Sequence, residues 1–154
     1  MSSYRHIYEI VSRTKSLLSN NEDTEYETTL LLNCCLGLLI IPQQETSRTK
    51  PVFLRQRVSY DEWGIDPNQN KGAEATYDIG EVTRHFRNSL AHNRFDIIDC
   101  NPGPSINNIR IRDYYDEDDV KQGKPNFDLT LSISDFKRFV LKYATEIENI
   151  LKNL

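Results

Sequence analysis

Hydrophobic residues recur at helical spacing at both ends of the chain. The N-terminal pattern predicts an amphipathic helix over residues 3–19. A second helix is predicted from about Thr24 to Ile41; its second half is apolar on nearly every side, and Pro42 ends it. The C-terminal stripe predicts a final helix capped by Ser132 or Ser134. Its apolar members are Phe136, Phe139, Val140, Tyr143, Ile147, Ile150, Leu151 and Leu154.

A third helix is predicted in the middle of the chain. Asp78 is suited to cap its N-terminus, with Glu81 three residues later in a variant of the capping box. Asn93 is suited to end it, because asparagine tolerates the left-handed conformation found just past helix ends. The expected core face consists of Ile79, Val82, Thr83, Phe86 and Leu90.

The period changes from helical to alternating over residues 95–133. "FDIID" is a candidate strand, and "IRIRDYY" and "FDLTLSI" predict a hairpin joined by an acidic loop. Residues 43–77 are less regular, and we expect at most a short helical turn near "SYDEW". The predicted fold class is mainly α: a four-helix up-down bundle with a small β-hairpin insertion between helices three and four, as one domain over residues 1–154.

Composition narrows the class of protein. The formal net charge is -4, but residues 48–57 carry only basic charges and residues 113–119 only acidic ones. Cys34, Cys35 and Cys100 lack metal-binding spacing, and we expect all three to be reduced. The N-terminus has no secretory pattern, and the most apolar run, residues 30–41, is shorter than a membrane span. We therefore expect a cytoplasmic protein with no membrane partner.

The stretch "TRHFRNSLAHNRF", residues 83–95, carries the candidate chemistry. On a helical projection, His85, Asn88 and His92 fall together, opposite the core face. The two histidines are about two turns apart, roughly 10 Å along the axis at the helical rise per residue. Helical zinc motifs place their histidines one turn apart, so this spacing argues against a metal site, and we expect no metal or other cofactor.

Two interpretations of this polar face stay open from the residues alone. A polar face opposite a core face is normally solvated, and basic residues near a helix C-terminus complement its dipole. Solvated faces usually carry lysine and glutamate, however, whereas this one carries histidine, asparagine and arginine. Histidine exchanges protons near neutral pH, and arginine holds phosphate through two parallel hydrogen bonds. The second interpretation is therefore phosphate chemistry.

The spacing Arg87, "NSLA", His92 resembles the Arg–polar–x–x–x–His motif of HEPN domains (higher eukaryotes and prokaryotes nucleotide-binding). The polar residue after the arginine is Asn88, one of the types that the family favours. The motif's place near the end of a third helix, the leucine-rich second helix and the final amphipathic helix are also similar to the compact HEPN proteins of bacterial plasmids and defence loci. The resemblance covers the helical core, residues 3–42 and 76–154.

The resemblance implies a metal-independent endoribonuclease that works as a homodimer, with the motif helices of two subunits forming one cleft. By this resemblance Arg87 binds the scissile phosphate, His92 is the general acid or base, and Asn88 orients His92 or binds phosphate. Arg84, His85 and Arg94 are further candidates for substrate binding. RNA supplies its own nucleophile, the 2′-hydroxyl, so proton transfer and charge stabilisation suffice for cleavage.

Other roles and partners are open at this stage. The alternative to an enzyme is a non-catalytic HEPN module that binds nucleotide or RNA, or that dimerises within a toxin–antitoxin or defence complex, with an antitoxin or defence component as its partner. The basic segment 48–57 is either a phosphate-binding patch or a solvated loop. We expect the acidic segment 113–119 to point away from the cleft, and Trp63 to anchor local packing rather than stack on a base.

Overall fold

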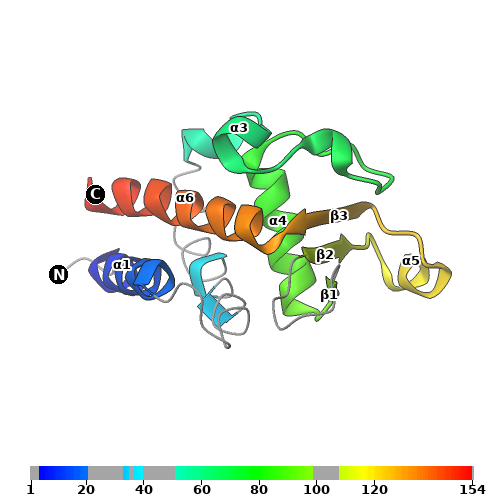
Figure 1. Cartoon of the computed structure of the whole chain (residues 1–154), viewed down its shortest axis with the longest axis horizontal. Coiled ribbons are helices and arrows are strands. Elements are labelled where there is room, and N and C mark those ends of the chain that lie inside the picture. The colour runs from blue at the N-terminus through cyan, green and yellow to red at the C-terminus, as the bar shows by residue number, and fades with distance from the viewer. Residues whose placement is uncertain (1–3, 21–32, 35–36, 40–50, 99–107, 154) are drawn as a thin grey trace.

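The computed structural model describes residues 4–20, 33–34, 37–39, 51–98 and 108–153. Over these residues the fold is mainly helical with a small three-stranded antiparallel sheet. The elements are α1 (Tyr4–Asn20), η1 (Val52–Arg55), α3 (Tyr60–Trp63), η2 (Pro67–Gln69), α4 (Ile79–Ala91), β1 (Phe95–Ile98), β2 (Asn108–Asp113), α5 (Glu117–Gln122), β3 (Phe127–Ser132) and α6 (Ile133–Lys152) (Figure 1). The predicted helical class is confirmed, whereas the four-helix up-down arrangement is not.

The second predicted helix lies mostly outside the described residues. Residues 33–34 and 37–39 are helical, and the side chains of Cys34, Leu38 and Leu39 are buried. The predicted stop at Pro42 lies outside the described residues. Cys35, Cys100 and Leu154 also lie outside them.

Helices α1 and α6 lie side by side (Figure 1). The carboxylate of Glu148 on α6 accepts hydrogen bonds from Ser12 Oγ at 2.6 Å and Lys15 Nζ at 3.1 Å on α1. Ile7 and Val11 on α1 are buried as well. Apolar packing and the hydrogen bonds to Glu148 therefore both join α1 to α6. None of the helices in the described part of the chain is long and apolar enough to cross a bilayer.

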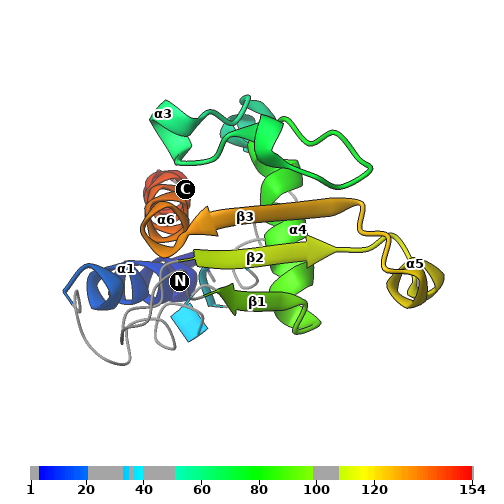
Figure 2. The same ribbon diagram turned by 45° about the vertical axis from the view of Figure 1, so that its right-hand side comes forward.

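The sheet has the strand order β1-β2-β3 and covers one side of α4, which crosses behind the strands (Figure 2). The predicted hairpin is confirmed, since Ile111 of β2 pairs with Leu129 of β3. The candidate strand "FDIID" joins it as a third strand, with Phe95 opposite Ile111. The acidic connection contains helix α5, which projects from one end of the sheet (Figure 2).

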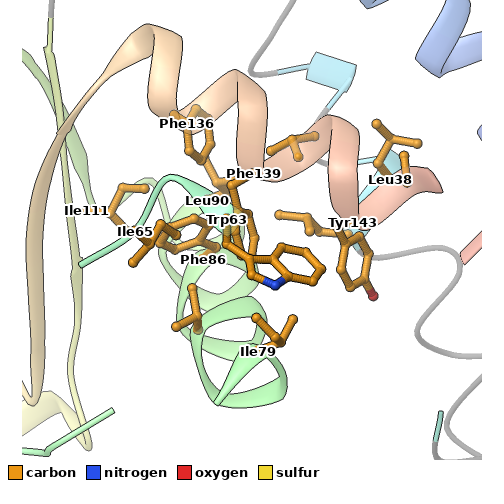
Figure 3. Packing of buried hydrophobic residues seen from close by; sticks show 14 of the residues in the cluster. Leu38, Trp63, Ile65, Ile79, Phe86, Leu90, Ile111, Phe136, Phe139 and Tyr143 are labelled. Atoms are coloured by element: carbon orange, nitrogen blue, oxygen red, sulfur yellow. The ribbon is translucent and has the colours of Figure 1, made fainter. Parts of the chain in front are cut away.

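Aromatic side chains fill the space between α3, α4 and α6 (Figure 3). Trp63 is only 1% exposed, and the centroid of its ring lies 5.5 Å from that of Phe139 and 6.4 Å from that of Phe53. Phe86 of α4 packs edge-on against Phe139 at 5.1 Å. The prediction that Trp63 anchors packing is confirmed, because its ring joins the irregular segment to α6 and is closed to solvent.

The irregular segment runs along the outer edge of β3 and is held there by backbone and side-chain hydrogen bonds. Lys71 donates its N–H to the carbonyl of Asp128 at 2.8 Å, and Asp128 donates its N–H to Asn70 Oδ1 at 3.0 Å. A Cβ on Gly72 would lie 2.3 Å from the carbonyl oxygen of Asn126, so only glycine permits this close approach. The predicted turn near "SYDEW" is confirmed as α3.

Candidate functional site

Helix α4 carries the candidate site and begins and ends as its sequence predicts. Asp78 Oδ1 accepts a hydrogen bond from the N–H of Glu81 at 2.7 Å, and Glu81 Oε2 accepts one from the N–H of Tyr77 at 3.2 Å. The first bond satisfies a donor that the first turn leaves without an intrahelical partner, and the second binds the residue before the cap to the same turn. At the other end Asn93 adopts a φ of 56°, the left-handed conformation expected past a helix end.

The side chain of His85 lies under the sheet, so its prediction as part of the exposed polar face is wrong. It is 0% exposed, and its ring stacks on Phe127 of β3 with a centroid distance of 4.5 Å and an interplanar angle of 5°. The helical projection placed it correctly relative to its neighbours on α4. It did not reveal that the sheet extends the buried side of the helix beyond the apolar stripe.

A carboxylate from the sheet receives this buried histidine. In β2, Ile109, Ile111 and Asp113 are buried and alternate with half-buried residues, so the acid shares the face that packs against α4. His85 Nδ1 lies 2.8 Å from Asp113 Oδ2, and Asn88 Nδ2 donates to the same oxygen at 3.3 Å. The second and third turns of the motif helix are therefore tied to the last residue of β2.

Further hydrogen bonds fix Asp113 and the adjacent backbone. The other carboxylate oxygen, Oδ1, accepts from the N–H of Tyr114 at 2.9 Å. Ser89 Oγ lies 2.6 Å from the carbonyl oxygen of Arg112 and 2.7 Å from that of His85, so it bridges helix and strand. Burial opposes ionisation of Asp113, but the hydrogen bonds from His85 and Asn88 outweigh it and hold the pKa of this carboxyl below its usual range.

The side chain of His92 is exposed at the C-terminal end of α4. Its backbone N–H donates to the carbonyl of Asn88 at 3.0 Å, one turn earlier. Both residues line a pocket of about 460 Å³ between the end of α4 and the segment that follows β2. The other described residues that line it are Arg94, Asp113, Tyr114, Tyr115, Asp116 and Glu117.

Arg87 is half-buried and lies on the other flank of the exposed strip of α4. It is not among the described residues that line the pocket beside His92. Burial raises the pKa of the Tyr143 hydroxyl on α6, and the positive charge of Arg87 opposes that rise. Asn88 and His92, in contrast, line the pocket beside the segment that follows β2. The structure brings together two of the three motif residues within one chain.

Two of the predicted substrate-binding arginines have carboxylate partners. Arg84 Nη2 lies 3.3 Å from Glu74 Oε1, in an exposed pair. Arg94 Nη2 lies 3.2 Å from Glu117 Oε1, and its guanidinium lies 5.4 Å from the centre of the Tyr114 ring. Substrate binding by Arg84, His85 and Arg94 stays a prediction.

The acidic segment lies next to His92, so the prediction that it points away from the site is wrong. Asp113, Asp116 and Glu117 all line the His92 pocket. Two contacts hold the segment there: Asp113 is buried against α4, and Glu117 pairs with Arg94, two residues after His92. Within the described residues, no three His, Cys, Asp or Glu side chains are grouped so as to hold a metal ion.

One family model, described as HEPN pEK499 p136, matches residues 1–154. The chain belongs to this family. The match covers the whole sequence, including the sheet and the irregular segment, and it confirms the HEPN resemblance. Searches of curated proteins and of solved structures found no match to the chain.

In this HEPN chain, sequence reasoning missed the contribution of Asp113. The signal was present in "IRIRD", because residues two apart on a strand point to the same face. The two isoleucines mark the buried face of β2, so the aspartate at the next position of that alternation must also be buried. A buried carboxylate needs hydrogen-bond donors, and α4 supplies them through His85 and Asn88.

Proposed function

We propose that this HEPN chain is a metal-independent endoribonuclease that cleaves RNA at a site shared by two copies. The observation that carries the proposal is the exposed end of α4, where His92 and Asn88 line one open pocket and the HEPN-type Arg87 lies on the other flank of the same helix. A toxin or anti-phage defence effector is the biological role that we propose for such a ribonuclease.

The residues take distinct chemical roles in this proposal. His92 removes the proton from the 2′-hydroxyl or donates one to the leaving 5′-oxygen, because an imidazole exchanges protons near neutral pH. Arg87 binds the scissile phosphate and stabilises the additional negative charge of the transition state. Asn88 orients His92. No step requires a group other than the side chains and the RNA itself.

The positions of the motif residues support a shared site. Arg87 and His92 lie on different flanks of the exposed strip of α4, and the His92 pocket does not include Arg87 among its described lining residues. A second chain related by a two-fold axis can bring its own Arg87 to that pocket. The phosphate is then held by one subunit and the proton transferred by the other.

Single substitutions test the proposed chemistry. We expect His92→Ala and Arg87→Ala each to lower the cleavage rate of RNA by about 10²–10⁴-fold, the range for removal of a general acid or base or of a charge-stabilising group. His6→Ala and Arg5→Ala are matched controls, because both residues are exposed on α1. Products should end in a 2′,3′-cyclic phosphate, and cleavage should continue in the presence of a chelator. Loss of cleavage on chelation would refute the metal-independent mechanism.

A second candidate function is a non-catalytic module that binds a protein partner, such as an antitoxin or another defence component. The observation that favours it is the acidic lining of the His92 pocket by Asp113, Asp116 and Glu117, which disfavours a phosphate chain there. Under this alternative, purified dimer does not cleave RNA, and His92→Ala leaves partner binding unchanged. The two candidates are separated by the first cleavage assay of purified protein.

A further inference from the structure

We infer that Asp113 is a positioning residue that acts through Asn88, so that the carboxamide oxygen of Asn88 is turned toward His92. This inference rests on the proposed ribonuclease function, because it assigns a task to a residue outside the HEPN motif. It also makes the sheet part of the site, since Asp113 belongs to β2 and the motif belongs to α4.

Asn88 turns the NH₂ end of its carboxamide toward the sheet. An ionised carboxylate only accepts hydrogen bonds, so the group of Asn88 that contacts Asp113 Oδ2 at 3.3 Å must be its NH₂. The two ends of a carboxamide lie on opposite sides of its central carbon. With the nitrogen held on Asp113, the oxygen is the end of the carboxamide that does not contact this carboxylate, and it presents an acceptor.

Hydrogen bonds to both of its oxygens hold Asp113 in place. His85 Nδ1 lies 2.8 Å from the same oxygen, and both side chains are almost fully buried, at 0% and 3% exposed. The N–H of Tyr114 donates to the other oxygen at 2.9 Å. The carboxylate therefore has donors on both oxygens and does not rotate freely. Because His85 stacks on Phe127, the sheet also holds the imidazole that donates to this carboxylate.

Asn88 lies one helical turn before His92, the proposed general acid or base. Residues four apart on a helix lie on the same face, and His92 follows Asn88 at that spacing. In the proposed site, the carboxamide oxygen of Asn88 accepts a hydrogen bond from an imidazole N–H of His92. Such a bond leaves the other ring nitrogen to exchange the proton with the RNA. This geometry assigns an N–H of Asn88 to Asp113 and the oxygen of Asn88 to the orientation of His92.

A kinetic test uses Asp113→Ala with Asp118→Ala as its matched control. Asp118 is an exposed acid in the first turn of α5, and it is not among the described residues that line the His92 pocket. We expect Asp113→Ala to lower kcat about 10- to 100-fold with little change in KM, the loss expected when a catalytic group is misplaced by about 1 Å. Asp118→Ala should leave kcat unchanged.

A double-mutant cycle separates positioning from loss of structure. In an Asn88→Ala background, Asp113→Ala should lower kcat no further, because the residue through which it acts is already absent. Two effects that multiply fully would overturn the inference. Asp113→Asn, which preserves the side-chain shape, replaces Asp113→Ala if the latter does not fold.

A measurement that does not depend on activity completes the test. The side-chain NH₂ of Asn88, identified by its absence from the spectrum of Asn88→Ala, should have a high ¹⁵N order parameter in the wild-type protein and a low one in Asp113→Ala. It should stay high in Asp118→Ala. An equally ordered NH₂ in Asp113→Ala would overturn the inference even if the wild type cleaves RNA. Absence of wild-type cleavage would instead refute the proposed function, and this spectrum would still decide whether Asp113 holds Asn88.

Discussion

The middle and the C-terminal end of the motif helix differ in what covers them. His85, in the middle of α4, is closed under the sheet, stacked on Phe127 and paired with Asp113. His92, at the end of the same helix, is exposed beside an open pocket. Identical side chains two turns apart therefore have different surroundings: the first is fixed between helix and sheet, and the second is open to solvent. Residue type alone does not distinguish them.

Replacing each histidine by alanine gives the sharpest contrast. His92→Ala should lower RNA cleavage by about 10²–10⁴-fold and leave the urea midpoint of unfolding nearly unchanged, because an exposed side chain supports little packing. His85→Ala should lower the free energy of unfolding by about 3–5 kcal/mol, because it leaves a cavity against Phe127 and removes a donor from buried Asp113.

Urea unfolding and RNA cleavage, measured on the same preparations, check both halves of this contrast. His6→Ala is the control for each, since His6 is exposed on α1. If His85→Ala were as stable as the wild type, the buried pair would contribute nothing to stability and the division of tasks would be wrong. If His92→Ala unfolded at lower urea by a similar amount, His92 would also be structural.

The pH dependence of stability, a smaller effect, should distinguish buried Asp113 from exposed Glu117 in the same pocket. The pKa of Asp113 is held below its usual range in the folded protein, so its ionised form stabilises the fold above the unfolded-state pKa. That contribution is lost as the pH falls through the lower folded-state pKa. Asp113→Asn should therefore be about 1–3 kcal/mol less stable than the wild type at pH 7, and the difference should shrink below about pH 4.

Glu117→Gln is the matched control for this pH dependence. Its side chain is 80% exposed, and its pair with Arg94 is screened by solvent. Urea unfolding at pH 7 and at several acidic values should give parallel curves for Glu117→Gln and the wild type. A constant difference between Asp113→Asn and the wild type at every pH would contradict the assignment of Asp113 as an ionised, hydrogen-bonded carboxylate.

Local sequence patterns predicted the features that depend on neighbouring residues. The apolar stripe of α6, the Asp78 cap, the left-handed Asn93 and the alternation of the hairpin strands all involve contacts within a few positions along the chain. The Arg87–His92 spacing, set by one helix, also indicated the family that the whole-chain match confirms.

Features that depend on distant segments were not predictable in this way. His85 is buried because strands β2 and β3, which begin more than twenty residues later, cover one flank of α4. The acidic segment lies beside His92 because Asp113 and Glu117 are held by α4 and Arg94. A helical projection shows which residues share a face, but it does not show how much of that face another part of the chain covers.

The central claim is that the ribonuclease site takes Arg87 from one subunit and His92 from the other. Subunit exchange tests it most directly. Arg87→Ala and His92→Ala dimers, each inactive alone, are mixed under conditions that exchange subunits, which is verified with two different affinity tags. A shared site predicts recovery to about a quarter of the wild-type rate, because about half of the dimers are mixed and each mixed dimer has one of its two sites intact. A mixture with verified exchange that stays as inactive as its components would contradict the account.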